Sequence, residues 1–163
     1  MTFLLDVNVL IALIDPTHLS HDAAHRWFET QGAASWATCP ITVNGVVRIV
    51  GSPKYPNTPG SPAAVADVLK RFTARAGHVF WFDDVNLLNG RYVDTDKLLT
   101  SGQVTDTCLL ALAVARGGQL ASFDRRLSGA AVPGGRSGLH LIESNFGQTG
   151  DSPPMKLLVK TKS

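Results

Sequence analysis

Residues 2–14 read TFLLDVNVLIALI, and Asp6 is the one charged residue in that run. The pattern predicts a short buried strand through Leu5 that turns straight into an apolar helix starting at Val7 or Asn8. A carboxylate at such a junction is costly to desolvate unless it is paired, hydrogen-bonded or bound to a metal. Because open α/β sheets bind ligands at the carboxyl ends of their strands, Asp6 marks a candidate ligand site.

Asp106 and Asp124 stand at similar borders of apolar segments. Each of the three aspartates has a simpler interpretation as a helix cap, which is worth roughly 1 kcal/mol. Asp6 would cap the first helix, Asp106 would open a helix over 107–115, and Asp124 would cap 125–127. The same arrangement occurs three times in one small domain, and this repetition favours a site that binds a cation.

The composition is that of one globular domain. The chain has 163 residues, 44% hydrophobic and 17% charged, enough to bury a core. A net charge of +2 is too small to indicate a nucleic-acid partner by itself. No apolar stretch reaches the roughly 20 residues of a membrane span, and the amino terminus lacks the basic region of a signal peptide. We therefore expect a cytosolic protein without a membrane partner.

Cys39 and Cys108 lie far apart in apolar surroundings, and neither belongs to a CxxC pair. They are interpreted as buried thiols and not as a disulfide or zinc site. The basic pair Arg125 and Arg126 adjoins Asp124. This pair is either an ordinary solvated surface or, if Asp124 holds a metal, a contact for a phosphate group.

Apolar segments that read as strands alternate with segments that read as helices, and this order predicts a parallel α/β sheet. The domain is predicted over residues 1–147, with a peripheral or flexible tail over 148–163. Proline and glycine make 51–62 a loop inside the domain. The expected strands are 2–5, 35–38, 79–82, 118–123 and 139–142, and the expected later helices are 40–50, 63–76 and 107–115.

His18, His21 and His25 recur at helical intervals, so a metal cluster has to be considered. Ala24 and Trp27 complete the buried stripe of an ordinary helix in the same segment. No cysteine or glutamate completes a ligand set there. The ordinary helix is the favoured interpretation.

Three segments, LLDVNVLIAL at 4–13, VTDTCLLALA at 104–113 and LASFDRRL at 120–127, together resemble the PIN-domain ribonucleases. The most similar branch is the VapC-type toxins of bacterial toxin–antitoxin pairs. The resemblance covers roughly the first 145 residues. It implies a three-layer α/β/α fold with a central parallel sheet of about five strands.

The resemblance also implies a site and an activity. Asp6, Asp106 and Asp124 are expected to be catalytic residues that hold Mg²⁺ or Mn²⁺ for hydrolysis of RNA phosphodiester bonds. Asn8 and Ser122 are expected to be their hydrogen-bonding neighbours. Such proteins generally form homodimers and bind a cognate antitoxin protein, so both partners are expected here beside the RNA substrate.

The sequence departs from the family pattern at one position. PIN domains commonly carry a glutamate near the start of the helix after the second strand, but residues 42–48 read TVNGVVR. Either Val43 or Asn44 takes its place, and only Asn44 offers an oxygen, as a weaker supporting ligand. The alternative function is therefore a degenerate PIN domain that binds RNA or a protein with little or no catalysis.

A haloacid-dehalogenase-like phosphatase also begins with an aspartate after a strand. Such enzymes use an Asp-x-Asp pair, whereas the second position here is Asn8. A response-regulator receiver is disfavoured because it carries acidic pairs near its first strand. The chain has neither a glycine-rich phosphate loop nor a Gly-x-Ser-x-Gly elbow.

Overall fold

A computed structural model describes residues 1–144 of the chain. Its centre is one five-stranded sheet, in which every neighbouring pair is parallel and the order is β3-β2-β1-β4-β5. The expected parallel α/β sheet of five strands is thereby confirmed. The strands are β1 Phe3–Leu5, β2 Trp36–Thr38, β3 His78–Phe80, β4 Gln119–Ser122 and β5 Leu139–Leu141.

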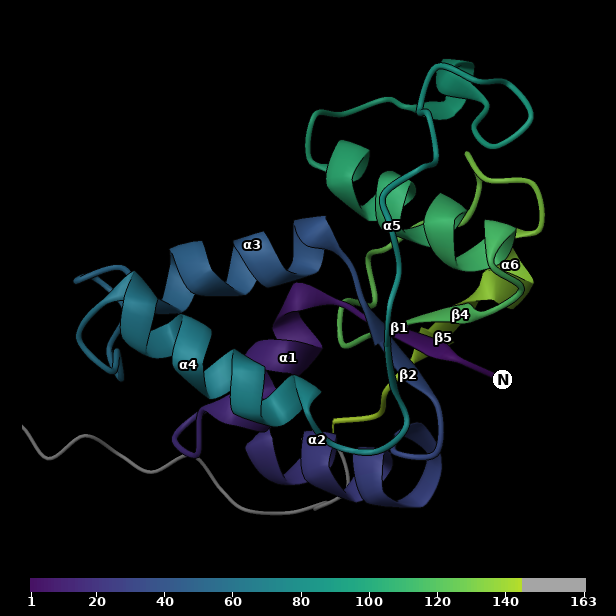
Figure 1. Cartoon of the computed structure of the whole chain (residues 1–163). Coiled ribbons are helices and arrows are strands. Elements are labelled where there is room, and N and C mark those ends of the chain that lie inside the picture. Colours follow the sequence, from purple (N-terminus) through teal and green to yellow (C-terminus); the bar gives the residue numbers. More distant parts are fainter. Residues whose placement is uncertain (145–163) are drawn as a thin grey trace, which may run out of the picture.

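Helices cover both faces of this sheet (Figure 1). The α-helices are α1 Val7–Ile14, α2 His21–Trp27, α3 Pro40–Val50, α4 Pro62–Thr73, α5 Gln103–Ala115 and α6 Gly135–Gly138. A π-helical turn, η1 Phe28–Gly32, follows α2, and a 3₁₀ turn, η2 Thr95–Lys97, precedes α5. Within residues 1–144 no helix is both long and apolar enough to traverse a bilayer.

The two faces of the sheet have separate apolar cores, because side chains alternate along each strand. Phe3 and Leu5 of β1 point into the core shared with α1 to α4, whereas Leu4 between them points into the core beneath α5. Trp36 and Ala37 of β2 divide in the same way. The interiors of β1, β2 and β4 are therefore apolar, and their polar groups lie at the strand ends, whereas β5 has His140 at its centre.

Helix α5 begins earlier than the sequence predicts. It starts at Gln103, so Asp106 lies in its first turn and does not open the helix at 107. The Gln103 side-chain oxygen accepts hydrogen bonds from the backbone N–H groups of Leu99 and Thr100, at 2.9 and 3.0 Å, and fixes the chain before the helix. The other expected elements occur with shifts of a few residues. The tail over 148–163 and residues 145–147 lie outside the described residues.

The histidines of α2 have a structural role. The ring nitrogens of His21 and His25 lie 2.7 and 3.0 Å from the carbonyl oxygens of Ala12 and Leu13. These carbonyls belong to the last turn of α1, where the helix itself supplies no donor. The favoured interpretation of an ordinary helix therefore agrees with the contacts, and no metal-holding group of three His, Cys, Asp or Glu residues occurs in 1–144.

Asp15 at the end of α1 anchors the proline-rich loop 51–61. Its buried carboxylate accepts hydrogen bonds from the Tyr55 hydroxyl, from Asn57 Nδ2 at 2.7 Å and from the Thr17 backbone and hydroxyl at 2.9 and 2.8 Å. Burial raises the pKa of Asp15, but these donors outweigh it and hold the pKa well below its usual value. The loop is thus fixed by one ionised side chain.

We predict that Asp15→Ala lowers the free energy of unfolding by about 2–3 kcal/mol, since it removes the charged acceptor that Tyr55, Asn57 and Thr17 share. Asp67→Ala, which removes only an exposed pair with Lys70, should cost less than about 1 kcal/mol. Urea unfolding at pH 7 measures both. Because the folded pKa is depressed, the Asp15 contribution is complete above the unfolded pKa of 3.8 and is lost as pH falls below it. Equal losses in the two variants would contradict this role.

Candidate functional site

Asp6 sits at the carboxyl end of the central strand β1, where the chain turns into α1. Its backbone N–H donates to the Ala121 carbonyl of β4 at 3.0 Å, so the residue is still tied to the sheet. Its carboxylate Oδ1 accepts the Val7 N–H at 2.7 Å and caps α1. The side chain is only 7% exposed. The capping interpretation is therefore correct for Asp6, but it occupies only one of the two carboxylate oxygens.

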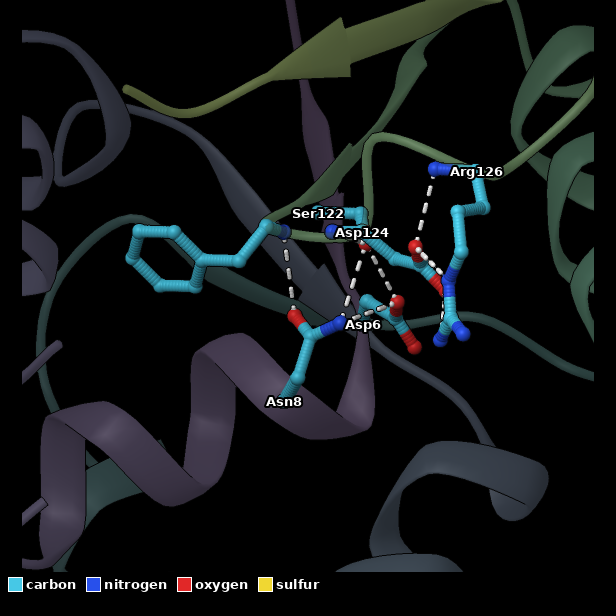
Figure 2. A network of polar contacts seen from close by, with 6 residues as sticks. Asp6, Asn8, Ser122, Asp124 and Arg126 are labelled. Atoms are coloured by element: carbon cyan, nitrogen blue, oxygen red, sulfur yellow. Dashed lines mark hydrogen bonds and ion pairs between the residues drawn. The ribbon is translucent and has the colours of Figure 1, made fainter. Parts of the chain in front are cut away.

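The other oxygen of Asp6 is the centre of a polar network between β1, α1 and β4 (Figure 2). The Ser122 hydroxyl donates to Asp6 Oδ2 at 2.6 Å, and Asn8 Nδ2 donates to the same oxygen at 3.0 Å. Asn8 Nδ2 also donates to Ser122 Oγ at 3.0 Å, while Asn8 Oδ1 accepts the Phe123 N–H at 3.2 Å. Asn8 and Ser122 thus hold the carboxylate in one orientation.

Asp106 approaches this network from α5, on the opposite side of the sheet from α1. It is half-buried, and no hydrogen bond to its carboxylate comes from residues 1–144. Burial raises its pKa, and the negative charges of Asp6 and Asp124 raise it further. Burial likewise raises the pKa of Asp6 more than its hydrogen bonds lower it. Two carboxyl groups of the site therefore have raised pKa values, and Arg126 offsets only part of the shift at Asp106.

Asp124 is in a different environment. Its Oδ1 accepts from the Arg126 backbone N–H at 2.9 Å and from Arg126 Nε at 3.1 Å, and these contacts lower its pKa. Its own N–H donates to Ser122 Oγ at 3.1 Å, which joins it to the Asp6 network. Residues 125–127 form a turn, so Asp124 does not cap a helix. Arg125 is exposed and has no ion pair within the described part of the chain.

The donor set fits a hard divalent cation. Carboxylate and hydroxyl oxygens are the ligands that Mg²⁺ prefers, and it commonly takes one or two carboxylates and completes its shell with water. Asp6 and Asp106 are two carboxylates of this kind. The three aspartates do not form a closed cage, because residues 1–144 contain no group of three His, Cys, Asp or Glu side chains placed to hold one ion. Ligation of a cation by Asp6, Asp106 and Asp124 therefore stays a prediction.

Helix α3 brings no acidic group to the site. Asn44 is exposed, and its side chain makes no hydrogen bond within residues 1–144, while Val43 packs half-buried against the core of α1 and α4. The contact with the site's own helix is made by Gly45, where an added Cβ would lie 2.8 Å from Val7 Cγ2. This close approach is a feature that the sequence analysis missed. A glycine inside the predicted helix 40–50 was its only signal.

Comparison with known proteins identifies the family. A model of the PIN domain matches residues 3–133 of the chain. The chain belongs to the PIN-domain family. Among its relatives in Mycobacterium tuberculosis, Ribonuclease VapC44 is 45% identical over 134 residues, which cover 82% of this chain and 94% of the relative. Ribonuclease VapC39 is 46% identical over the same length, with 82% and 96% covered. Within the family, the chain is therefore a VapC-type protein.

Solved structures agree with the PIN fold. M. tuberculosis VapC20, described as a toxin that cleaves the sarcin-ricin loop, covers 80% of this chain and 96% of its own, with a TM-score of 0.57 and 13% identity. VapBC2 of Rickettsia felis, solved with a promoter DNA fragment, covers 76% and 88%, with a TM-score of 0.51 and 15% identity. At these identities the likeness extends to the fold alone, and it confirms the three-layer architecture.

We predict that Asp106→Asn raises the melting temperature of the metal-free PIN domain at pH 7, by no more than about 4 °C. Because the pKa of Asp106 is raised in the folded protein, the stability that its protonated carboxyl group contributes is lost as pH rises through that pKa. Asparagine removes the charge, and with it the repulsion from Asp6 and Asp124. Added Mg²⁺ or Mn²⁺ should stabilise the natural protein more than the variant. Thermal unfolding with EDTA or with metal measures both.

Asp96→Asn is the matched control, because Asp96 is an exposed carboxylate outside the network. Asp106 is also a cleaner position than Asp6 for this test. An asparagine at position 6 would turn an N–H₂ group toward the Asn8 donor at 3.0 Å and would destabilise the network for a reason unrelated to charge. A lower melting temperature for metal-free Asp106→Asn, or the same metal response in all three proteins, would contradict the cation site.

Proposed function

We propose that this VapC-type PIN domain is a metal-dependent endoribonuclease that hydrolyses RNA phosphodiester bonds and acts as the toxin of a toxin–antitoxin pair. The observation that carries the proposal is the buried Asp6 carboxylate, held by Ser122 and Asn8 at the carboxyl edge of the sheet, whose charge helps to raise the pKa of Asp106. The membership of the family and the names of the relatives support the ribonuclease class.

Asp6 and Asp106 are proposed to hold Mg²⁺ or Mn²⁺. When bound, such an ion stabilises charge on the phosphoryl oxygens and lowers the pKa of an attacking water. The protein supplies orientation, since Ser122 and Asn8 fix Asp6 Oδ2 and the Val7 N–H fixes Oδ1. Asp6 is therefore ready to bind a cation without a further loss of side-chain freedom.

Arg126 is proposed to exchange its partner when RNA binds. Its side chain is 90% exposed and is held only through Asp124, at 3.1 Å from Nε to Oδ1. An exposed ion pair of this kind contributes little to stability, so a substrate phosphate can replace the carboxylate. The freed Asp124 would then face Asp106 and the cation. Exposed Arg125 is a second candidate contact for the phosphate backbone.

The partners follow from the same proposal. A cognate VapB-type antitoxin is expected, because the structural relative from R. felis is a VapBC complex. RNA is the proposed substrate, a homodimer the proposed assembly, and the cytoplasm the proposed place of action.

The second candidate is a PIN domain that binds RNA or a partner with little catalysis. The observation that favours it is the absence of an acidic group on α3, where Asn44 is exposed and Val43 lies in apolar packing. One carboxylate fewer weakens the attraction for a cation, and particularly for a second one.

We predict that the purified protein cuts bacterial RNA in Mg²⁺ or Mn²⁺, and that Asp6→Asn and Asp106→Asn each reduce the cleavage rate at least about a hundredfold, because each removes charge that binds the metal. Gel analysis of the fragments measures the rate, with EDTA and Asp67→Asn as controls. Asp67 is an exposed carboxylate on α4, away from the network.

The outcomes separate the two candidates. Discrete fragments that disappear with EDTA and in both site variants support the nuclease. They also show that the glutamate common in PIN domains, which α3 of this chain lacks, is dispensable. Cleavage that persists in Asp106→Asn at the rate of Asp67→Asn contradicts the site. RNA binding without metal-dependent cleavage favours the binding module.

A further inference from the structure

The charges of the chain are divided unevenly between the described domain and the residues that follow it. Residues 1–144 contain twelve lysines and arginines and twelve aspartates and glutamates, so their formal net charge is zero with histidine neutral. Residues 145–163 contain three lysines and one aspartate. The net charge of +2 therefore belongs entirely to residues 145–163.

The domain itself offers a polyanion little attraction. Four of its cationic side chains are already paired with carboxylates, namely those of Lys70, Lys97, Arg116 and Arg126. A fifth, Arg75, lies over the buried rings of Phe28 and Phe72. Asp6, Asp106 and Asp124 add negative charge at the edge where RNA would be cut. Since fields of exposed charges are screened beyond about 10 Å, a neutral domain of this kind does little to collect RNA from solution.

The three remaining lysines are gathered in one short stretch. Residues 155–163, which we call the basic segment, read MKLLVKTKS and contain no acidic residue. Asp151, the one acidic residue after Ser144, lies four positions before the segment. The PIN-domain model matches residues 3–133, so the basic segment lies outside the part of the chain that the family model covers.

The chain leaves the described domain at the edge of the sheet that carries the site. In the parallel pair of β4 and β5, Leu141 lies opposite Ser122, and the Ile142 N–H donates to the Ser122 carbonyl at 2.9 Å. Asp124 follows Ser122 by two residues, as Glu143 follows Leu141. Because neighbouring strands lie about 4.8 Å apart, the two chains leave the sheet side by side.

The basic segment is therefore joined to the site by a short connection. Twelve residues separate Lys156 from Ser144, and a chain of that length spans at most about 43 Å, whatever path it takes. A strand of RNA held by the lysines has a raised local concentration at the carboxylates, as in any tethered pair of binding sites.

We propose that Lys156, Lys160 and Lys162 bind the phosphate backbone of the RNA and supply the attraction that the neutral domain lacks. Lysine ammonium groups bind phosphates as point charges and release counterions from the nucleic acid, a contribution that does not depend on base sequence. This inference rests on the proposed nuclease function, which makes a polyanion the substrate at this edge of the sheet.

The lysines are expected to act on binding and not on hydrolysis, because no residue of the Asp6 network belongs to the basic segment. An interaction that is equally strong in the ground state and in the transition state affects KM and leaves kcat unchanged. With metal present, loss of the three charges should therefore raise KM and leave kcat as it is.

The test measures binding of the full-length chain to a fluorescein-labelled single-stranded RNA by anisotropy, in EDTA and over a range of salt from about 50 to 200 mM. Lys156→Gln, Lys160→Gln and Lys162→Gln, made together, should weaken binding about tenfold or more at 0.1 M salt. They should also lower the slope of log K against log salt by about 2, since each contact with a single strand contributes about 0.7.

The matched control changes Lys54, Lys70 and Lys97 of the domain to glutamine together, which removes the same charge and leaves the basic segment intact. Its dissociation constant should change less than about twofold, because lysines that do not contact RNA release none of its counterions. A second variant, Lys156→Arg, Lys160→Arg and Lys162→Arg, keeps the charges and should keep both the dissociation constant and the salt slope. Circular dichroism checks that all three proteins fold.

Several results would overturn the proposal. They are an unchanged dissociation constant and salt slope in the glutamine variant of the basic segment, and an equal loss in the domain control, which would assign the attraction to total charge. Natural RNA binding by that variant together with loss of a co-expressed antitoxin would assign the segment to a protein partner instead.

The failure of this inference is distinguishable from the failure of the nuclease function. Metal-dependent cleavage with natural kcat and KM in the glutamine variant would show that the inference alone has failed. A natural protein that neither binds nor cuts RNA would overturn the nuclease function and the inference with it.

Discussion

The structure depends on a buried carboxylate at the end of the central strand. Asp6 is tied to the sheet by its backbone, caps α1 with one oxygen and receives Ser122 and Asn8 at the other. Since an isolated buried charge is strongly unfavourable, these donors are a condition for the fold as well as for the site. These donors join β1, α1 and β4 at one point, but all of them are neutral groups, so no positive charge neutralises the carboxylate.

The other two aspartates have different electrostatic environments. Asp106 is half-buried without a hydrogen-bond donor among residues 1–144, and its raised pKa reflects burial and repulsion. Asp124 is neutralised by Arg126, and its pKa is lowered. Two carboxylates with raised pKa values beside one that is paired with Arg126 support the proposed cation site, in which Arg126 is the proposed contact for a phosphate. Because α3 has no acidic residue, the proposed cation binding depends more strongly on Asp6 and Asp106.

Much of this arrangement could be predicted from the sequence. Apolar strands alternating with helices led to the parallel sheet, the carboxylate directly after the first strand led to Asp6, and the resemblance to PIN domains led to Asn8 and Ser122. The start of α5 could not be predicted, because it is fixed by the Gln103 side chain and not by apolar periodicity. The approach of Gly45 to Val7 depends on how α3 packs on α1, and spacing along the chain does not encode it.

The most direct test of the account is a crystal structure of the protein grown with Mn²⁺, in which anomalous scattering locates the ion. We predict one strong peak about 2 Å from oxygens of both Asp6 and Asp106, with water completing the shell and Ser122 and Asn8 still bonded to Asp6. A peak elsewhere on the surface, or an ordered site that holds no ion at millimolar Mn²⁺, would contradict the claim that this carboxylate network exists to bind a cation.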